Sequence, residues 1–207
     1  AAYAFVPPGV QGPAPGQDYR SLGAKLIEGF NPAEAKRLLA EAGFPEGRDF
    51  PVIELLLDDN QNHKAVAEAI TGMWREHLGV QSKIVEQEYR VYLNTMFARD
   101  YQVARVGWIA DYNDPMTFLD MWVTGNDNNL ADWENAEYDR LIGSATGSGD
   151  RAVRNGLMFE AEKILMDELP IVPIYYYTNP YLERESVKGV IHPSFGILAE
   201  FKWAYVE

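Results

Sequence analysis

The sequence of 207 residues contains no cysteine, which excludes disulfide bonds, thiolate nucleophiles and cysteine-ligated metal sites. No apolar run approaches the ~20 residues that a membrane-spanning helix needs, and the first residues lack the basic and then apolar pattern of a signal peptide. Basic residues are few, because 18 Lys and Arg stand against 31 Asp and Glu, for a formal charge of −13 without a compensating basic stripe. Such a chain repels a phosphate backbone, so we expect no nucleic-acid partner.

Motifs of the common catalytic and cofactor sites are also missing. The sequence has no HExxH, GxSxG or GxGxxG pattern and no P-loop, and its histidines (His63, His77 and His192) are too scattered for a spaced metal site. The acidic clusters lack the ligand spacing and the glycine of an EF-hand calcium loop. The sequence therefore predicts no cofactor and no metal.

What is present indicates a folded chain. Hydrophobic residues make up 47% and charged residues 24% of the sequence, which is ordinary globular usage. Residues 1–30 begin with a stretch rich in proline and glycine, and we expect them to form an irregular connecting segment. The chain starts with Ala1 instead of methionine, so we expect a processed form or an excised piece of a longer protein.

Strands and helices are predicted to alternate in the first half. An N-cap at Asn31 followed by Pro32 predicts a short helix, and Gly79 marks the end of a longer one. Apolar periodicity predicts strands over 50–57 and 80–87, helices over 61–78 and 89–97, and an extended stretch over 101–108. This order favours an open α/β sheet, in which ligands bind at the carboxyl ends of strands.

The second half is predicted to be mainly helical. The pattern predicts a short helix over 115–123, helices over 134–146 and 150–169, a strand over 171–177 and short extended stretches over 181–207. We find no internal repeat.

The densest set of potential binding residues lies between Arg105 and Pro115. A strand there is followed by Trp108 and Asp111, and Gly107 permits close approach of a ligand or another backbone. A structural interpretation is also open, in which Trp108 is a core residue, Asp111 caps a turn and Arg105 is a solvated strand residue.

Three motifs in this order resemble the oligopeptide-binding proteins of bacterial ABC importers, the extracytoplasmic solute-binding proteins of family 5. They are LLAEAGF at 38–44, ARVGWIADYNDP at 104–115 and PIVPIYYY at 170–177. The resemblance implies an α/β lobe of the type II periplasmic-binding-protein kind, with a mixed open sheet flanked by helices. It further implies a fragment in which 1–30 connects, 31–180 forms the ligand-binding lobe, and 181–207 returns toward a missing N-terminal lobe.

The resemblance also implies roles for individual residues. Asp111 matches the aspartate that anchors the α-ammonium of a bound peptide, and Trp108 matches a tryptophan that packs on the ligand nearby. Arg105 and His63 match residues that face the peptide's carboxylate, and both are or can become cationic.

Two further positions match the family's pocket. Tyr89 replaces the more usual tryptophan, and Leu93 lies one helical turn later. An arginine that some members use for shorter peptides aligns with Met96, so that ion pair is absent here. The ordinary alternatives are a surface position for His63, core positions for Tyr89 and Leu93, and a neighbouring acid as the partner of Arg105.

The function implied is the capture of oligopeptides outside the cytoplasm, in the periplasm or at the cell surface, and their delivery to the membrane permease of an ABC importer, without catalysis. Within the same fold, the ligand could instead be a dipeptide, a nickel complex, haem or a sugar. Two other classes stay open: a hydrolase that uses Asp58 or Asp59 with Asp111, and an interaction module with a surface rich in Tyr and Trp.

Overall fold

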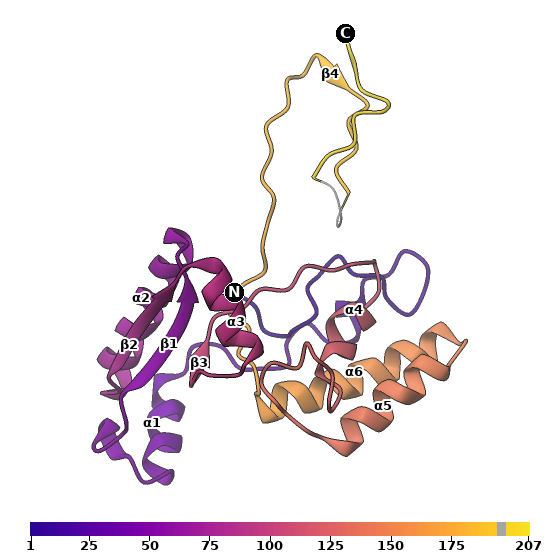
Figure 1. Ribbon diagram of the computed structural model, residues 1–207. Coiled ribbons are helices and arrows are strands. Elements are labelled where there is room, and N and C mark those ends of the chain that lie inside the picture. Colours follow the sequence, from indigo (N-terminus) through magenta and orange to yellow (C-terminus); the bar gives the residue numbers. More distant parts are fainter. Residues whose placement is uncertain (194–197) are drawn as a thin grey trace. The chain divides into compact units, whose positions relative to one another are not determined.

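The computed structural model describes residues 1–193 and 198–207 (Figure 1). Its contacts divide the chain into two compact units. Unit 1 comprises residues 1–27 and 108–207, and unit 2 comprises residues 28–107. Unit 2 is therefore continuous in sequence, whereas unit 1 is built from two separate stretches. No helix in the described ranges combines the length and the apolar content needed to cross a membrane.

Unit 2 contains a parallel sheet of three strands with β1 in the centre, in the order β2-β1-β3. Both strand pairs are parallel (Figure 1). Asp58 lies opposite Gln87, and Leu56 lies opposite Ala104. The elements of this unit are α1 (Pro32–Glu41), η2 (Pro45–Gly47), β1 (Ile53–Asp58), α2 (Gln61–Leu78), β2 (Ser82–Gln87), α3 (Tyr89–Phe97) and β3 (Val103–Ala104).

Helix α2 has the bounds predicted from the sequence, because both of its ends carry strong local signals. The side chain of Asn60 accepts hydrogen bonds from the backbone N–H groups of Asn62 and His63. Gly79 ends the helix in the left-handed conformation, with φ +71°. The sheet is held from within by Leu55 and Leu57 of β1, which are buried with Ala67 of α2.

Unit 1 is built around an antiparallel pair of helices, α5 and α6, which lie side by side in Figure 1. Their facing sides bury apolar residues at helical spacing, and α4 adds Phe118 and Leu119 to the same core. The elements are η1 (Tyr19–Leu22), α4 (Met116–Leu119), η3 (Asp120–Trp122), α5 (Ala136–Gly147), α6 (Arg151–Glu168), β4 (Val187–Lys188) and β5 (Tyr205–Val206).

The N-terminal stretch of unit 1 is irregular apart from η1, as expected, but it also contributes to the core. Val6, Val10 and Tyr19 are buried together with residues of α4, α5 and α6. Glu162 of α6 is fully buried, accepts hydrogen bonds from the backbone N–H groups of Phe5 and Val6, and forms an ion pair with Arg20. Residues 1–27 are therefore an integral part of unit 1.

Two predicted strands differ from the structure. Residues 171–177 were predicted as a strand but form no ladder, and Pro173 has no N–H group to donate to one. This stretch is instead attached to the N-terminal segment, through a hydrogen bond of 3.0 Å from the Ala2 N–H to the Ile174 carbonyl and one of 2.7 Å from the Tyr176 hydroxyl to the Ala4 carbonyl.

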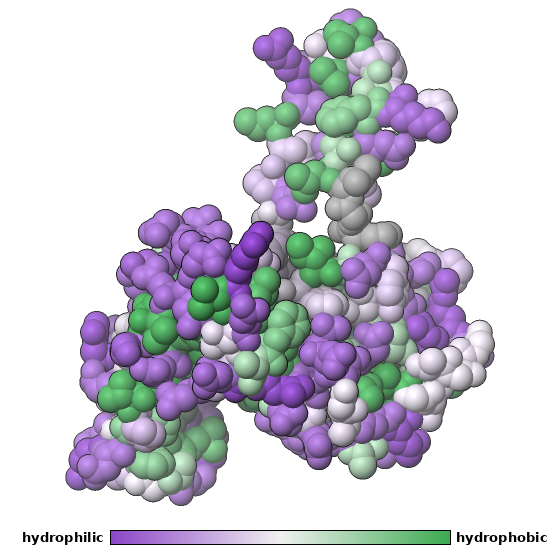
Figure 2. All heavy atoms as spheres, viewed as in Figure 1, coloured by the Kyte–Doolittle hydropathy of each residue, from purple (hydrophilic) through white to green (hydrophobic). Residues whose placement is uncertain are grey.

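The extended stretch predicted over 101–108 is shorter than expected. Only β3 pairs as a strand, and one further bond of 2.9 Å runs from the Arg105 N–H to the Leu56 carbonyl. The C-terminal stretch contains the expected short extended pieces, β4 and β5, which pair antiparallel. Large apolar side chains of this stretch are exposed (Figure 2), among them Leu182 and Phe201.

The predicted α/β class with an open sheet and flanking helices is confirmed. The contacts draw the boundaries of the two units at 27/28 and 107/108. The functional division of the chain into a connecting segment (1–30), a ligand-binding lobe (31–180) and a return segment (181–207) stays a prediction.

Candidate functional site

The parallel sheet of unit 2 places several predicted site residues near one edge. Strands β1, β2 and β3 run in the same direction, so their carboxyl ends meet at one edge of the sheet. His63 follows β1, Tyr89 and Leu93 follow β2, and Arg105 follows β3 directly. Four residues from three separate segments are therefore delivered to the edge at which open α/β sheets bind ligands.

His63 is held in place by a buried carboxylate. Its Nδ1 atom lies 2.5 Å from Oδ1 of Asp58, the last residue of β1, which is only 8% exposed. Because a carboxylate can only accept, Nδ1 carries the proton in this pair, and the ring is oriented with Nε2 on its opposite side. Asn60 fixes the backbone at this point, since its side chain caps the first turn of α2.

Tyr92 connects the residues that follow β2 and β3. Its hydroxyl donates a hydrogen bond to the carbonyl of Arg105, and its ring stacks against Tyr89 with a centroid distance of 6.3 Å. Burial raises the pKa of Tyr92 to about 12, so its hydroxyl stays protonated and able to donate. Tyr89 is exposed and Leu93 is partly exposed, whereas Met96 is buried in the unit.

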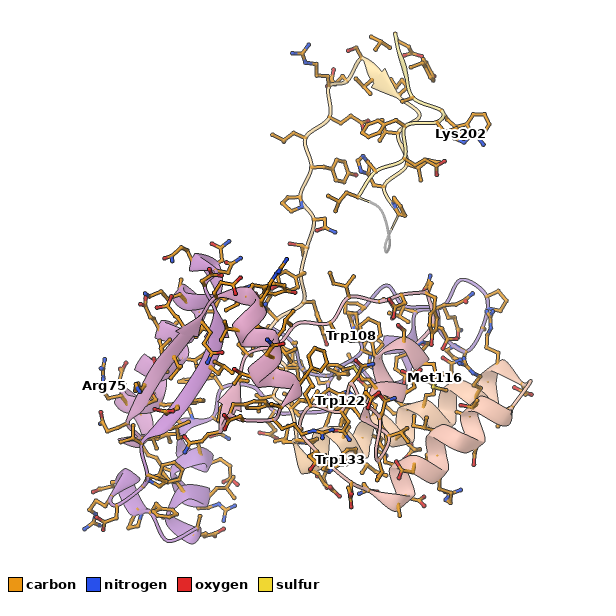
Figure 3. The ribbon with its side chains drawn as sticks, viewed as in Figure 1. Arg75, Trp108, Met116, Trp122, Trp133 and Lys202 are labelled. Carbon is orange, nitrogen blue, oxygen red and sulfur yellow. The ribbon has the colours of Figure 1, made fainter. Side chains whose placement is uncertain are left out.

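Trp108 and Asp111 in unit 1 are both bonded to Thr117 of α4. The indole N–H of Trp108 donates to the Thr117 carbonyl at 2.7 Å, and the backbone N–H of Asp111 donates to Thr117 Oγ1 at 3.1 Å. Trp108 is partly buried and packs against the core of unit 1, near α4 (Figure 3). The Asp111 side chain is exposed, and it forms no hydrogen bond or ion pair with the described residues.

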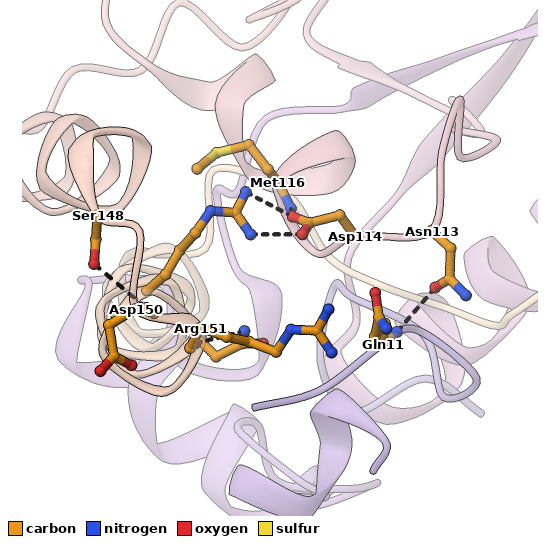
Figure 4. Close-up of polar contacts among 9 residues, drawn as sticks. Gln11, Asn113, Asp114, Met116, Ser148, Asp150 and Arg151 are labelled. Atoms are coloured by element: carbon orange, nitrogen blue, oxygen red, sulfur yellow. Dashed lines mark hydrogen bonds and ion pairs between the residues drawn. The ribbon is translucent and has the colours of Figure 1, made fainter. Parts of the chain in front are cut away.

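The end of the loop that carries Asp111 is fixed by a second set of contacts (Figure 4). Asp114 receives two hydrogen bonds from the guanidinium of Arg154, at 2.5 and 2.8 Å, and its Oδ1 also accepts from the Met116 N–H. Asn113 accepts a bond of 2.9 Å from the Gln11 N–H. The loop is thus anchored to both α6 and the N-terminal segment.

The electrostatics around Asp111 favour a positive charge. Burial raises the pKa of Asp120, and the negative charge of Asp111 raises it further. The charge of Asp114 is balanced by Arg154, whereas Asp111 has no cationic partner among the described residues. An ammonium group beside Asp111 would supply the missing counter-charge.

The structure therefore brings the predicted residues together in two groups. His63, Tyr89, Leu93 and Arg105 belong to unit 2, and Trp108 and Asp111 belong to unit 1. That the two groups contact one ligand stays a prediction. Among the described residues no three His, Asp or Glu side chains form a group that could hold a metal ion.

Two residues of this region, Tyr92 and Thr117, were not identified as site residues from the sequence. Asp58 was named only as an acid of the hydrolase alternative, not as the partner of His63. Asp58 had a usable signal, because an acid at the end of a strand lies close to the first turn of the following helix. Tyr92 and Thr117 act through bonds that only the folded chain creates, with Arg105 and Asp111 respectively.

Comparison with known proteins gives a family match over much of the chain. Residues 1–130 match the model of the bacterial extracellular solute-binding proteins, family 5 Middle. The dipeptide-binding protein DppE of Bacillus subtilis is 38% identical over 205 residues, which is 98% of this chain and 37% of that protein. The periplasmic oligopeptide-binding protein OppA of Salmonella typhimurium is 34% identical, over 91% of this chain and 34% of that protein.

Solved structures agree with these matches. The substrate-binding domain of an oligopeptide ABC transporter from Bacillus anthracis superposes with a TM-score of 0.85 at 30% identity, covering 99% of this chain and 40% of that one. Haemophilus influenzae OppA in complex with the peptide RPPGFSPFR gives a TM-score of 0.74 at 32% identity, over 91% of this chain and 36% of that one. These likenesses confirm the predicted type II fold class. The chain spans 34 to 40% of the length of these four proteins.

Proposed function

Because the chain belongs to family 5 of the bacterial extracellular solute-binding proteins, we propose that it is part of a peptide-capturing component of an ABC importer. The component works outside the cytoplasm, in the periplasm or at the cell surface. It holds an oligopeptide by its charged termini and backbone and delivers it to a membrane permease. No bond in the ligand is made or broken.

The exposed carboxylate of Asp111 carries the proposal. It has no partner among the described residues, lies in negative surroundings with Asp120, and belongs to a loop that Thr117 and Arg154 hold in place. A carboxylate placed in this way is suited to accept charge-assisted hydrogen bonds from the α-ammonium of a peptide. Trp108 forms an apolar wall beside it, because its polar N–H is already bonded to Thr117.

The group in unit 2 serves the remainder of the ligand. Arg105 and His63 attract the terminal carboxylate, and His63 is oriented for this by Asp58. Tyr89 and Leu93 contribute one wall of a side-chain pocket, which agrees with their positions one turn apart and their partial or full exposure. The site is completed by an N-terminal lobe of the same protein, since this chain covers little more than a third of its relatives.

The experiment compares peptides with and without a free α-ammonium. The complete protein that contains this chain is titrated calorimetrically with a tripeptide of alanine and with its N-acetylated form. The variant Asp111→Ala is expected to bind the free-amine peptide roughly 10- to 150-fold more weakly, the range for a hydrogen bond to a charged group. Affinity for the acetylated peptide changes little. Asp127→Ala, which removes another exposed aspartate of unit 1, is the matched control and should leave both affinities unchanged.

Three results would contradict the proposal. An equal affinity of wild type and Asp111→Ala for the free-amine peptide would remove the role of Asp111. Native mass spectrometry of the complete protein offers an independent view, because a ladder of masses separated by amino-acid residues identifies a peptide carrier. A single non-peptide mass would mean that the protein binds another class of ligand with the same fold. Cleavage of added peptides would favour the hydrolase interpretation.

A further inference from the structure

We propose that Thr117 is the positioning residue of the α-ammonium anchor, acting through its hydroxyl on the backbone of Asp111. The inference rests on the proposed function of Asp111 and goes beyond it, because it names the residue that holds this carboxylate ready for the ligand. Thr117 itself is only 2% exposed and does not touch the ligand in this scheme.

Thr117 is placed to hold both unit 1 residues of the predicted site. Its carbonyl accepts the indole N–H of Trp108, and its Oγ1 accepts the backbone N–H of Asp111. The first bond uses the backbone, which every residue has, whereas the second needs a hydroxyl at this position. The side chain of Thr117 therefore acts on Asp111, and its backbone acts on Trp108.

The loop between Trp108 and α4 has little packing of its own. Ile109 is 78% exposed, and Asp111 and Tyr112 are exposed as well. Ala110 is the one residue of 109–112 that packs against the core of unit 1, so apolar burial orders this segment only weakly and its hydrogen bonds largely determine where the Asp111 backbone lies. The bond to Thr117 is the one described interaction that joins Asp111 to a buried side chain.

The other end of the loop is fixed independently of the Thr117 hydroxyl. Asp114 forms an ion pair with Arg154 and accepts a hydrogen bond from the Met116 N–H, and Asn113 accepts one from the backbone N–H of Gln11 (Figure 4). Removal of the hydroxyl therefore leaves the start of α4 and the Asp114 contacts in place. Its effect is confined to the part of the loop that carries Asp111.

Replacement of the hydroxyl by a methyl group acts in two ways. The Asp111 N–H loses its acceptor, and a methyl group cannot stay at the 3.1 Å that separates Oγ1 from this nitrogen, so the backbone shifts outward. A ligand must then order the carboxylate on binding, which costs conformational entropy. The loss should be specific for ligands that use Asp111.

The test uses the complete protein and three variants. Thr117→Val keeps the branched shape, Thr117→Ser keeps the hydroxyl, and Thr146→Val is a matched control, because its hydroxyl bonds only to a carbonyl of its own helix, Ile142. Each protein is titrated with the alanine tripeptide and with its N-acetylated form. Hydrogen exchange of the Asp111 amide is followed in the absence of ligand.

We expect Thr117→Val to bind the free-amine tripeptide about 2- to 12-fold more weakly, the range for one hydrogen bond, with no matching loss for the acetylated form. Exchange of the Asp111 amide becomes faster. Thr117→Ser keeps the affinity for the free-amine tripeptide and the exchange rate of the Asp111 amide close to those of the wild type, and Thr146→Val changes neither quantity. A variant that merely destabilised unit 1 would weaken both ligands alike.

Different results separate a failure of this inference from a failure of the proposed function. Unchanged exchange of the Asp111 amide in Thr117→Val, or equal weakening of binding for both peptides, would overturn the role of Thr117. The proposed function would stand in that case as long as Asp111→Ala still weakens binding of the free-amine peptide. If the wild type does not distinguish the free-amine peptide from the acetylated one, the anchor function of Asp111 fails, and the inference fails with it.

Discussion

Removal of the buried carboxylate of Glu162 should weaken unit 1 more than the loss of any surface charge. This carboxylate is 0% exposed and satisfies three donors: the backbone N–H of Phe5 at 3.0 Å, that of Val6 at 2.8 Å, and the guanidinium of Arg20. The N-terminal segment is therefore attached to α6 at two successive peptide groups and one side chain. Glu162→Ala removes both carboxylate oxygens and with them all three of these interactions.

The magnitude follows from what remains buried. Arg20 has a side chain that is 92% buried, and it would lose its counter-charge, while two backbone N–H groups would lose their acceptor. Breaking one partner of a buried ion pair costs about 3–5 kcal/mol. We expect Glu162→Gln to lose less than Glu162→Ala, because an amide oxygen can still accept from the N–H groups of Phe5 and Val6.

Burial raises the pKa of Glu162, against the opposite influence of Arg20 and of the two N–H groups. The ionised carboxylate is therefore costly in itself, although it is needed once Arg20 is present. The double variant Glu162→Leu with Arg20→Met should recover most of the stability that either single variant loses.

The assay is urea unfolding of the complete protein followed by tryptophan fluorescence, since Trp108, Trp122 and Trp133 all lie in unit 1. Hydrogen exchange at the Phe5 and Val6 amides locates the change. The control Glu160→Ala removes an exposed carboxylate from the same helix and should cost less than about 1 kcal/mol. A loss below 1 kcal/mol for Glu162→Ala, or protected Phe5 and Val6 amides in that variant, would refute the reasoning.

Two further predictions concern unit 2. Gly79→Ala should lower the free energy of unfolding by more than about 1 kcal/mol, because a Cβ atom at this φ of +71° would lie 2.3 Å from the carbonyl oxygen of Glu46. Gly72→Ala in α2 is the control, and equal unfolding free energies for the two variants would contradict the prediction. Asp58→Asn should weaken binding of peptides with a free carboxyl terminus about 2- to 12-fold, since the His63 ring loses the charged carboxylate beside it, while amidated peptides bind unchanged. Calorimetry with both peptide forms measures this, and equal losses for the two forms would refute a role of His63 in binding the peptide's carboxylate.

The parts of the fold that could be predicted from the sequence are those with local causes. Helix α2 has an Asn60 cap, a regular apolar stripe and Gly79 at its end, so its bounds follow from neighbouring residues alone. The open α/β sheet followed from the alternation of strands and helices, and the 104–115 motif carried the resemblance to the family. These signals placed Asp111 and Trp108 on one loop beyond a strand.

The remaining features depend on partners that are distant in sequence. Residues 171–177 look like a strand by composition, but their partner is the irregular N-terminal segment, with which they form isolated bonds. The first 27 residues look like a linker, yet Val6 and Tyr19 are buried against helices more than 100 residues later. Thr117 gives no signal of its own, because its importance lies in what its hydroxyl holds.

The insertion of unit 2 between the two stretches of unit 1 has a consequence for the order of folding. The bond between Val6 and Glu162 spans 156 residues, whereas the bond between Glu54 and Gln102 in unit 2 spans 48. Closing the longer loop costs about 1 kcal/mol more in chain entropy, and it also requires the chain to be present as far as Glu162. Unit 2 should therefore fold early and from local contacts, and unit 1 should fold late. Refolding should show two kinetic phases. If the contacts of Glu162 with Phe5, Val6 and Arg20 form in the transition state of the second phase, Glu162→Ala slows only that phase.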